Sequence, residues 1–249
     1  MCIRVLCFLG GVMSDIFKKF RGTAGYFSKK EILLWSVSAA FIVVSFVVFD
    51  RVNYLTLAAS LVGVTSLIFN AKGNPTGQLL MVVFSVMYGI ISLSFAYYGE
   101  MITYLGMTMP MAVFAFISWI RNPYNGNKSE VRVNSISCRE HLIMWIITAA
   151  VTCAFYFILS ALNTANIIPS TISVTTSFLA VYLSFRRSPL FALAYAANDV
   201  VLIVLWVLAS AENSRYISVV VCFAAFLVND FYGFVNWQKM KKRQLAAEE

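Results

Sequence analysis

Two asparagine–aspartate pairs lie inside long apolar stretches of this sequence, where a polar side chain is costly and usually has a function. Asn198 and Asp199 lie in the stretch 189–210, and Asn229 and Asp230 lie in a later one. At helical spacing, each pair shares a face with aromatic residues one or two turns away. The first face consists of Tyr195, Asn198, Asp199, Leu202 and Trp206, and the second of Phe226, Asn229, Asp230, Gly233 and Trp237, flanked by Tyr232 and Asn236.

These two faces are typical of a site for a flat, hydroxylated ligand. Aromatic rings stack on a heterocycle, and amides and carboxylates bind sugar hydroxyls. A cationic ring would gain further from a carboxylate and an aromatic face together. The alternative interpretation is that Asn and Asp only bond neighbouring helices. Because an ionisable residue in mid-span is functional by default, we predict that Asn198 and Asp199 bind a ligand. For Asn229 and Asp230 both interpretations stay open.

Two earlier stretches carry weaker polar faces, with Gln78 and Tyr88 on one and Tyr104 and Trp119 on the other. Trp119 could close the site from the cytoplasmic side or anchor its helix at the membrane interface. For Trp237 we predict the interface anchor. Pro110 predicts a kink or hinge near the middle of its helix. A stripe of small residues within 167–185 predicts close helix packing.

The composition favours the lipid bilayer as the solvent of this chain. Of its 249 residues, 60% are hydrophobic and 12% are charged, where an average soluble domain is about 25% charged. This excludes an ordinary cytosolic enzyme, a disordered protein and a free nucleic-acid binder. Attraction to anionic lipid accounts for the net charge of +8 without a nucleic-acid partner.

Sequence motifs for catalysis, metal binding and cofactor binding are absent. The five cysteines are odd in number and form no CxxC pair, so we expect neither a disulfide framework nor a metal site. His141 is the only histidine and has no HExxH partner. GxSxG, GxGxxG and Walker motifs are also missing. We therefore expect no enzyme, no catalytic residue, no metal, no cofactor and no direct drive by ATP.

Eight stretches are long and apolar enough to cross a membrane, which takes about 20 residues. They are residues 31–49, 53–70, 76–97, 100–120, 141–162, 167–185, 189–210 and 216–237. With the N-terminus in the cytoplasm, only Arg51 and Arg215 of the 19 Lys and Arg residues lie outside. This bias predicts a multi-pass protein with both termini in the cytoplasm. It puts Asp199 near mid-membrane and Asp230 nearer the cytoplasm.

Recurring turn residues divide the spans into two similar units of three helices. Both units start outside and end inside with one helix between them, so we predict parallel repeats with a substrate site between them near the midplane. The expected fold is all-α integral membrane, two parallel three-helix repeats joined by a linker helix (3+1+3) plus one extra N-terminal transmembrane helix. The recurring features are a basic turn ending in proline (72–75 and 186–189), an outer glutamate (Glu100 and Glu212) and an inner tryptophan (Trp119 and Trp237).

The predicted organisation has six parts along the chain. They are a cytoplasmic N-terminal segment (1–30), the extra helix (31–52), the first repeat (53–121), a cytoplasmic linker with the linking helix (122–166), the second repeat (167–238) and a cytoplasmic tail (239–249). Residues 1–12 are too short an apolar run to span a membrane. We interpret them as an upstream extension, because the sequence from Met13 is typical of a natural N-terminus.

Several stretches of the sequence resemble the PnuC-type vitamin transporters, over roughly residues 53–240. The resemblance implies a bacterial inner-membrane carrier of nicotinamide riboside, with two three-helix repeats joined by one helix, similar to the SWEET sugar carriers. The helix at 31–49 departs from that seven-helix core. The stretches are 70–75 (NAKGNP), 97–104 (YYGEMITY), Pro110-Met111, 118–131 (SWIRNPYNGNKSEV), 194–209 (AYAANDVVLIVLWVLA) and 229–237 (NDFYGFVNW).

The family resemblance also implies a mechanism. Uptake would be facilitated diffusion (uniport), and a cytosolic riboside kinase would trap the substrate as its phosphate for NAD biosynthesis. The pyridinium cation, amide and ribose of this substrate match the residue types above. Beyond substrate and lipid no partner is required, and a homo-oligomer is compatible. We expect substrate binding first from Asn198, Asp199 and Trp206, and then from Gln78, Tyr88, Tyr104, Trp119, Tyr195, Asn229, Asp230 and Asn236.

Three alternatives stay open at this point. The first is a carrier of another vitamin or nucleoside, such as thiamine or riboflavin, coupled to protons through Asp199. The second is an intramembrane enzyme, which the single histidine disfavours. The third is a scaffold or substrate-binding subunit that needs partner proteins for transport.

Overall fold

The computed structural model describes residues 26–94, 97–164 and 166–247. Residues 1–12 and the proposed start at Met13 lie outside this part. The chain divides into two compact units, residues 1–36 and 37–249. In the first unit, Ser28 caps the start of helix α2 (Lys29–Ser45). The Ser28 amide donates to Glu31 Oε2 at 2.6 Å and the Glu31 amide donates to Ser28 Oγ at 3.3 Å, which is a capping box.

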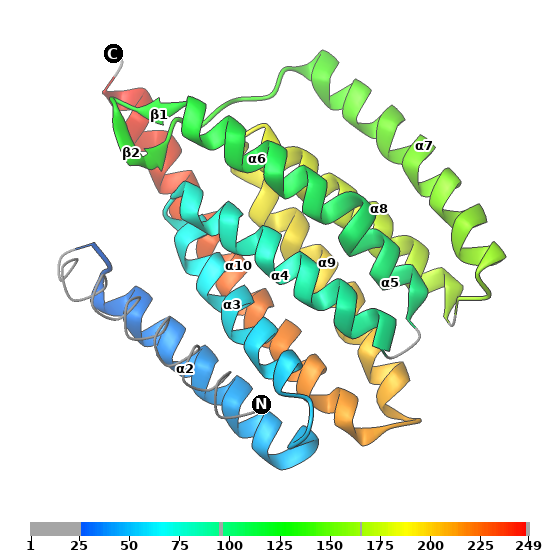
Figure 1. Ribbon diagram of the computed structural model, residues 1–249. Helices are drawn as coiled ribbons and strands as arrows, with labels where there is room; N and C mark the ends of the chain where they lie inside the picture. Colours follow the sequence, from blue (N-terminus) through cyan, green and yellow to red (C-terminus); the bar gives the residue numbers. More distant parts are fainter. Residues whose placement is uncertain (1–25, 95–96, 165, 248–249) are drawn as a thin grey trace. The chain divides into compact units, whose positions relative to one another are not determined.

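Eight helices in the described residues are long and apolar enough to cross a membrane, in agreement with the sequence. The second unit contains most of them (Figure 1). After the π-helical turn η1 (Phe46–Asp50) come α3 (Tyr54–Ala71), α4 (Pro75–Ser94), α5 (Tyr98–Ile102), the π-helical segment η2 (Thr103–Thr108), α6 (Met109–Arg121), α7 (Cys138–Ala161), α8 (Ile167–Phe185), α9 (Leu190–Ser210), the 3₁₀ turn η3 (Ser214–Tyr216) and α10 (Ile217–Ala246).

Six helices in the described part of the second unit pack in a closed circuit. Around it, α3 contacts α4, α4 contacts α6, α6 contacts α8, α8 contacts α9, α9 contacts α10, and α10 returns to α3. Helix α7 packs on the outside of α8 (Figure 1). The circuit faces helices 3, 4 and 6 toward helices 8, 9 and 10, so residues far apart in sequence share one interior.

The predicted polar linker contains a short hairpin that the sequence reasoning did not find. Strands β1 (Pro123–Tyr124) and β2 (Asn127–Val131) are antiparallel. Asn125 and Gly126 form the turn with φ of 46° and 75°, the positive-φ combination that matches strand twist in tight hairpins. The Val131 amide donates to the Gly73 carbonyl at 2.9 Å, which attaches β2 to the turn between α3 and α4.

The irregularity predicted at Pro110 lies one turn earlier. Residues 103–108 are π-helical and the α-helix resumes at Met109. Proline has no amide to donate to the preceding turn, and a π-bulge is one way in which a helix accommodates that loss. The last span is also longer than predicted, because α10 continues past residue 237 to Ala246.

The predicted small-residue stripe on α8 is buried. Its members are Ser170, Ser173, Ser177, Ala180 and Ser184, and each is at most 3% exposed. Their small side chains let α6 and α9 approach α8 closely.

Candidate functional site

The two aspartates of the sequence motifs meet in the interior of the second unit. Asp199 on α9 and Asp230 on α10 are each 4% exposed, and their carboxyl groups lie side by side. Asp230 thus lies beside Asp199 in the bundle interior.

A cluster of aromatic rings occupies the interior next to these carboxyl groups. Trp206 of α9 is fully buried, and its indole Nε1–H donates to Tyr88 Oη of α4 at 2.6 Å. The rings of Tyr88 and Tyr104 lie 4.4 Å apart, and Tyr97 lies 4.9 Å from Trp206. Three sequence-predicted residues, Trp206, Tyr88 and Tyr104, are therefore brought together from both sides of the circuit.

Asn198 and Asn229 have different surroundings. The side-chain oxygen of Asn198 accepts from Thr176 Oγ1 and Ser177 Oγ of α8, both at 2.9 Å. Asn229 donates from Nδ2 to Ser38 Oγ of α2 at 2.9 Å, so it binds α10 to α2. Asn198 and Asp199 thus face the interior from one helix, whereas Asn229 has the helix-bonding contact that the sequence left open.

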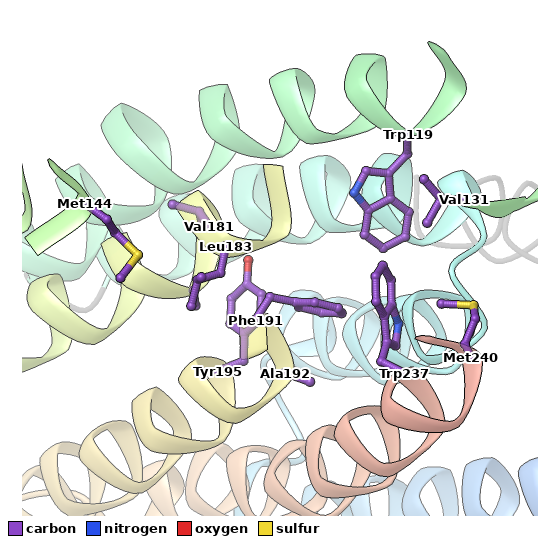
Figure 2. Close-up of a cluster of buried hydrophobic side chains, with 11 residues drawn as sticks. Trp119, Val131, Met144, Val181, Leu183, Phe191, Ala192, Tyr195, Trp237 and Met240 are labelled. Atoms are coloured by element: carbon purple, nitrogen blue, oxygen red, sulfur yellow. The ribbon is translucent and has the colours of Figure 1, made fainter. Parts of the chain in front are cut away.

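Four other predicted residues gather at one end of the bundle. Gln78 donates from Nε2 to Asn70 Oδ1 at 2.9 Å, and Asn236 donates from Nδ2 to the Ala71 carbonyl at 2.6 Å. Trp119 and Trp237 are both fully buried with ring centroids 5.3 Å apart (Figure 2). The interface-anchor prediction for Trp237 is wrong, because its ring packs against another tryptophan and does not reach the lipid surface.

Tyr195 connects this end cluster to the aspartates. It lies close to both carboxyl groups, and its ring contacts Phe191 at a centroid distance of 6.2 Å. Phe191 in turn lies 4.9 Å from Trp237 (Figure 2). The predicted residues thus form one continuous interior path of polar and aromatic groups, with Asn229 beside it.

Several residues of this interior were not predicted as site residues. Glu100 is 2% exposed and lies beside Ser173 of α8. Glu212, which occupies the corresponding position in the second repeat, is exposed. The two glutamates therefore match in sequence position but differ in burial. Phe84 and Phe223 contribute further rings around Tyr88. Helical spacing is the only sequence feature that marks Phe84 and Phe223, and it is equally typical of ordinary core residues.

The charge of this interior has one sign. In the part of the second unit that the structure describes, the buried charged side chains are all acidic, and no Lys or Arg is buried with them. An acidic, aromatic interior favours an organic cation and disfavours an anion, since uncompensated charge is costly away from water. These acidic residues are Glu100, Asp199 and Asp230 in the interior, and Asp50 apart from them at the end of η1.

Comparison with known proteins assigns the chain to a family. A sequence model of the nicotinamide mononucleotide transporter family matches residues 53–239. The chain belongs to this family. The PnuC resemblance found in the sequence is confirmed, and the expectation of a multi-pass membrane transporter and not an enzyme is confirmed with it.

Relatives of this transporter family include two nicotinamide riboside transporters PnuC. The one from Neisseria mucosa is 25% identical over 201 residues, covering 79% of this chain and 76% of the relative. The one from Haemophilus influenzae is 22% identical over 196 residues, covering 77% and 82%. The fold matches the crystal structure of the vitamin B3 transporter PnuC with a TM-score of 0.77 at 22% identity, over 88% of this chain and 94% of the other.

Proposed function

We propose that this protein takes up nicotinamide riboside across the bacterial inner membrane by facilitated diffusion. The observation that carries the proposal is the acidic, aromatic interior around Asp199 and Asp230. Nicotinamide riboside is a pyridinium cation with a ribose, so both charge and ring match this interior. The mononucleotide adds a phosphate, which buried carboxyl groups with no buried base would repel. The names of the relatives support the same substrate.

In this proposal the predicted residues have different roles in binding. Asp199 and Asp230 neutralise the pyridinium charge, and Trp206 with its tyrosine partners stacks on the ring. Asn198 is oriented by two hydroxyl groups of α8, which suits an amide that binds the ribose or carboxamide. Asn229 holds α10 against α2 and supports the site indirectly.

Reciprocal hydrogen bonds support the arrangement of two parallel repeats. The third helix of each three-helix repeat, α6 or α10, donates to carbonyl groups at the end of the first helix of the other repeat, α8 or α3. Such an exchange is expected of two units related by a two-fold axis. The bonds, donor first, are Trp119–Ser184 (2.9 Å), Trp237–Asn70 (2.7 Å), Ser118–Phe185 (3.0 Å) and Asn236–Ala71 (2.6 Å).

In the proposed transport cycle, one three-helix unit rocks against the other. The π-helical segment Thr103–Thr108 beside Pro110 provides a local irregularity at which the first three-helix repeat can bend. Both termini lie in the cytoplasm, as the positive-inside bias predicts. Phosphorylation by a cytosolic kinase would then retain the riboside.

Binding to the purified protein tests the substrate. We expect saturable binding of nicotinamide riboside, and much weaker binding of the mononucleotide, thiamine and riboflavin. Preference for the mononucleotide would contradict the proposal, because it would require a positive interior.

Proton coupling is the second candidate, favoured by the two buried carboxyl groups of Asp199 and Asp230, which lie side by side. Uptake into proteoliposomes with and without a pH gradient separates the two mechanisms. A uniporter equilibrates substrate without a gradient, and a strict requirement for the gradient would establish coupling. Because only this chain is present, the experiment also tests whether a partner protein is needed.

A further inference from the structure

A buried carboxyl group at the end of the bundle opposite Trp119 has no role in the binding proposed above. It belongs to Glu100, which lies on the short helix α5 near the start of the span Tyr98–Arg121, whereas Trp119 lies near the end of that span. The Glu100 side chain is 2% exposed. In the proposed orientation the start of this span is on the outer side of the membrane, so Glu100 lies where a substrate would enter.

The carboxyl group of Glu100 is not neutralised by a basic residue. Its Oε2 atom is buried and accepts no hydrogen bond from any residue that the structure describes. Ser173 of α8 lies beside it, and the Ser173 hydroxyl is likewise buried without a hydrogen-bond partner in the described residues. No Lys or Arg is buried in the described part of the second unit. Because an uncompensated carboxylate is costly away from water, this position favours a bound cation.

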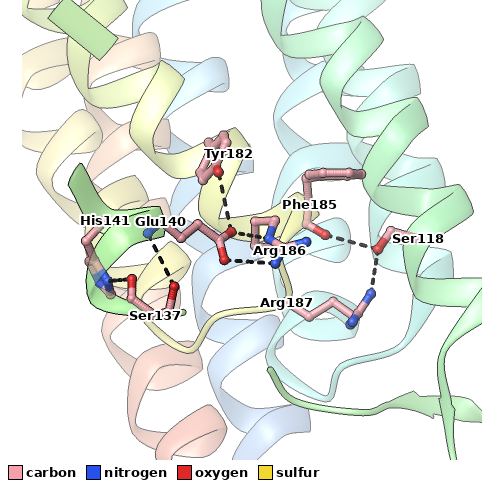
Figure 3. Close-up of polar contacts among 8 residues, drawn as sticks. All are labelled: Ser118, Ser137, Glu140, His141, Tyr182, Phe185, Arg186 and Arg187. Carbon is pink, nitrogen blue, oxygen red and sulfur yellow. Dashed lines mark hydrogen bonds and ion pairs between the residues drawn. The ribbon is translucent and has the colours of Figure 1, made fainter. Parts of the chain in front are cut away.

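Glu140 shows how a glutamate is neutralised elsewhere in this fold. Both of its carboxylate oxygens accept hydrogen bonds from Arg186, with Nη2 to Oε2 at 2.9 Å (Figure 3). The hydroxyl group of Tyr182 donates to the same carboxylate at 3.4 Å (Figure 3). These contacts join α7 to the end of α8, which is a structural role. Glu100 is more deeply buried than Glu140 and has no such ion pair among the described residues.

The backbone around Glu100 is held in place by close packing at Gly99. A Cβ added at Gly99 would lie 2.8 Å from Leu159 and 3.0 Å from Thr164, so α5 packs tightly against the end of α7 and the turn that follows it. The hydroxyl group of Thr103 donates to the Gly99 carbonyl at 2.9 Å. The carboxyl group of the next residue, Glu100, therefore has a fixed position in the interior.

The cluster of aromatic rings connects Glu100 to the carboxyl pair. Tyr104, four residues after Glu100, lies near both Glu100 and Asp199. Tyr88 of α4 also lies near Glu100, and the rings of Tyr88 and Tyr104 are 4.4 Å apart. Carboxyl groups therefore reach the same rings from two places. A cation that stacks on these rings would be attracted by the ring faces and by the carboxylates at both places.

We propose that Glu100 provides a further carboxylate for the substrate cation, at the outer end of the ring cluster, and thereby sets the preference for a charged ring over a neutral one. This role rests on the proposed function, since it takes a pyridinium riboside as the substrate. Dihydronicotinamide riboside is the matching neutral probe. It keeps the ribose and the carboxamide, but its reduced ring carries no charge, so a comparison of the two ligands isolates the contribution of the charge.

Titration calorimetry of the purified full chain with both ribosides tests this role. We expect Glu100→Gln to weaken binding of the charged riboside about tenfold and to change binding of the reduced form less than about twofold. A residue that only supports the fold would weaken both ligands alike, so the ratio of the two dissociation constants is the decisive quantity. An unchanged ratio would make Glu100 a neutral core residue and overturn the proposal, with the proposed function intact. Failure of the unmodified chain to bind the charged riboside would overturn both.

Two further variants make the test specific. Glu212→Gln removes the corresponding glutamate of the second repeat, which is exposed, and should leave the ratio within about twofold of the unmodified chain. An equal change with Glu212→Gln would indicate diffuse attraction and contradict a role of the buried position. Glu100→Asp keeps the charge on a shorter side chain, so it should retain a preference for the charged riboside, even where Glu100→Gln does not fold. Loss of that preference in Glu100→Asp would show that shape matters and not charge, and would overturn the proposal.

Discussion

At the scale of single residues, Asp199 combines burial, a carboxyl neighbour and an aromatic wall. We predict that Asp199→Asn weakens nicotinamide riboside binding about tenfold or more, because one buried negative charge no longer faces the pyridinium. An asparagine has nearly the same shape and can donate a hydrogen bond to Asp230, so the fold should persist. Titration calorimetry of the purified variant measures the dissociation constant.

A third buried aspartate, outside the carboxyl pair, provides the control for that experiment. Asp50 is 4% exposed and accepts a hydrogen bond from Asn53 at 2.7 Å, away from the ring cluster. Asp50→Asn should leave riboside affinity within about twofold of the unmodified protein. If the two variants bind equally well, the carboxyl pair is not the cation site.

The hydrogen bond between Trp206 and Tyr88 joins the two sides of the circuit through one contact of 2.6 Å. Trp206→Phe and Tyr88→Phe each remove this bond, so we expect each to cost about 1 kcal/mol of unfolding free energy beyond its packing effect. In a double-mutant cycle the two should couple by a similar amount. Unfolding in detergent measures it, and full additivity would mean that the bond contributes nothing to stability.

At the scale of elements, α3 and α10 approach closely at Gly63. A Cβ added there would overlap the ring of Phe226 and approach Phe84 at 3.1 Å. We predict that Gly63→Ala destabilises the protein by about 1–3 kcal/mol, because the rings have to shift in a packed core. The thermal midpoint in detergent is the measurement, and Phe226→Leu in the same chain should restore part of the loss.

Gly106 is the matched control, since it lies in the π-helical segment with an open surrounding. A Cβ there would meet only Ile102 Cγ2, at 3.8 Å. Gly106→Ala should be neutral or stabilising by up to about 1 kcal/mol through helix propensity. If Gly63→Ala behaved in the same way, the close approach of α3 and α10 would be wrong.

At the scale of the whole molecule, a uniporter of a cation must respond to the membrane potential. One elementary charge gains about 2.3 kcal/mol across about 100 mV. With the interior negative by that amount, proteoliposomes should accumulate nicotinamide riboside about fiftyfold, since about 1.4 kcal/mol is a factor of ten. Accumulation is measured against a potassium diffusion potential of set size. Proton exchange for the riboside would be electroneutral and would abolish this dependence.

The sequence by itself determined the solvent, the number of spans and the polar helix faces of this protein. Each span needs about 20 apolar residues, and the helical period alone puts Tyr195, Asp199 and Trp206 on one face. These are local properties, so they need no knowledge of neighbouring helices. The family resemblance followed from the same stretches of sequence and is confirmed over residues 53–239.

Only the tertiary structure decided which faces meet. Asp230 reaches Asp199 because α9 packs against α10, and Asn229, one residue earlier, faces α2 instead. Trp237 is buried because it packs against Trp119, which belongs to the other three-helix repeat. Such contacts depend on how helices pack across long sequence separations, which the pattern along one helix does not encode.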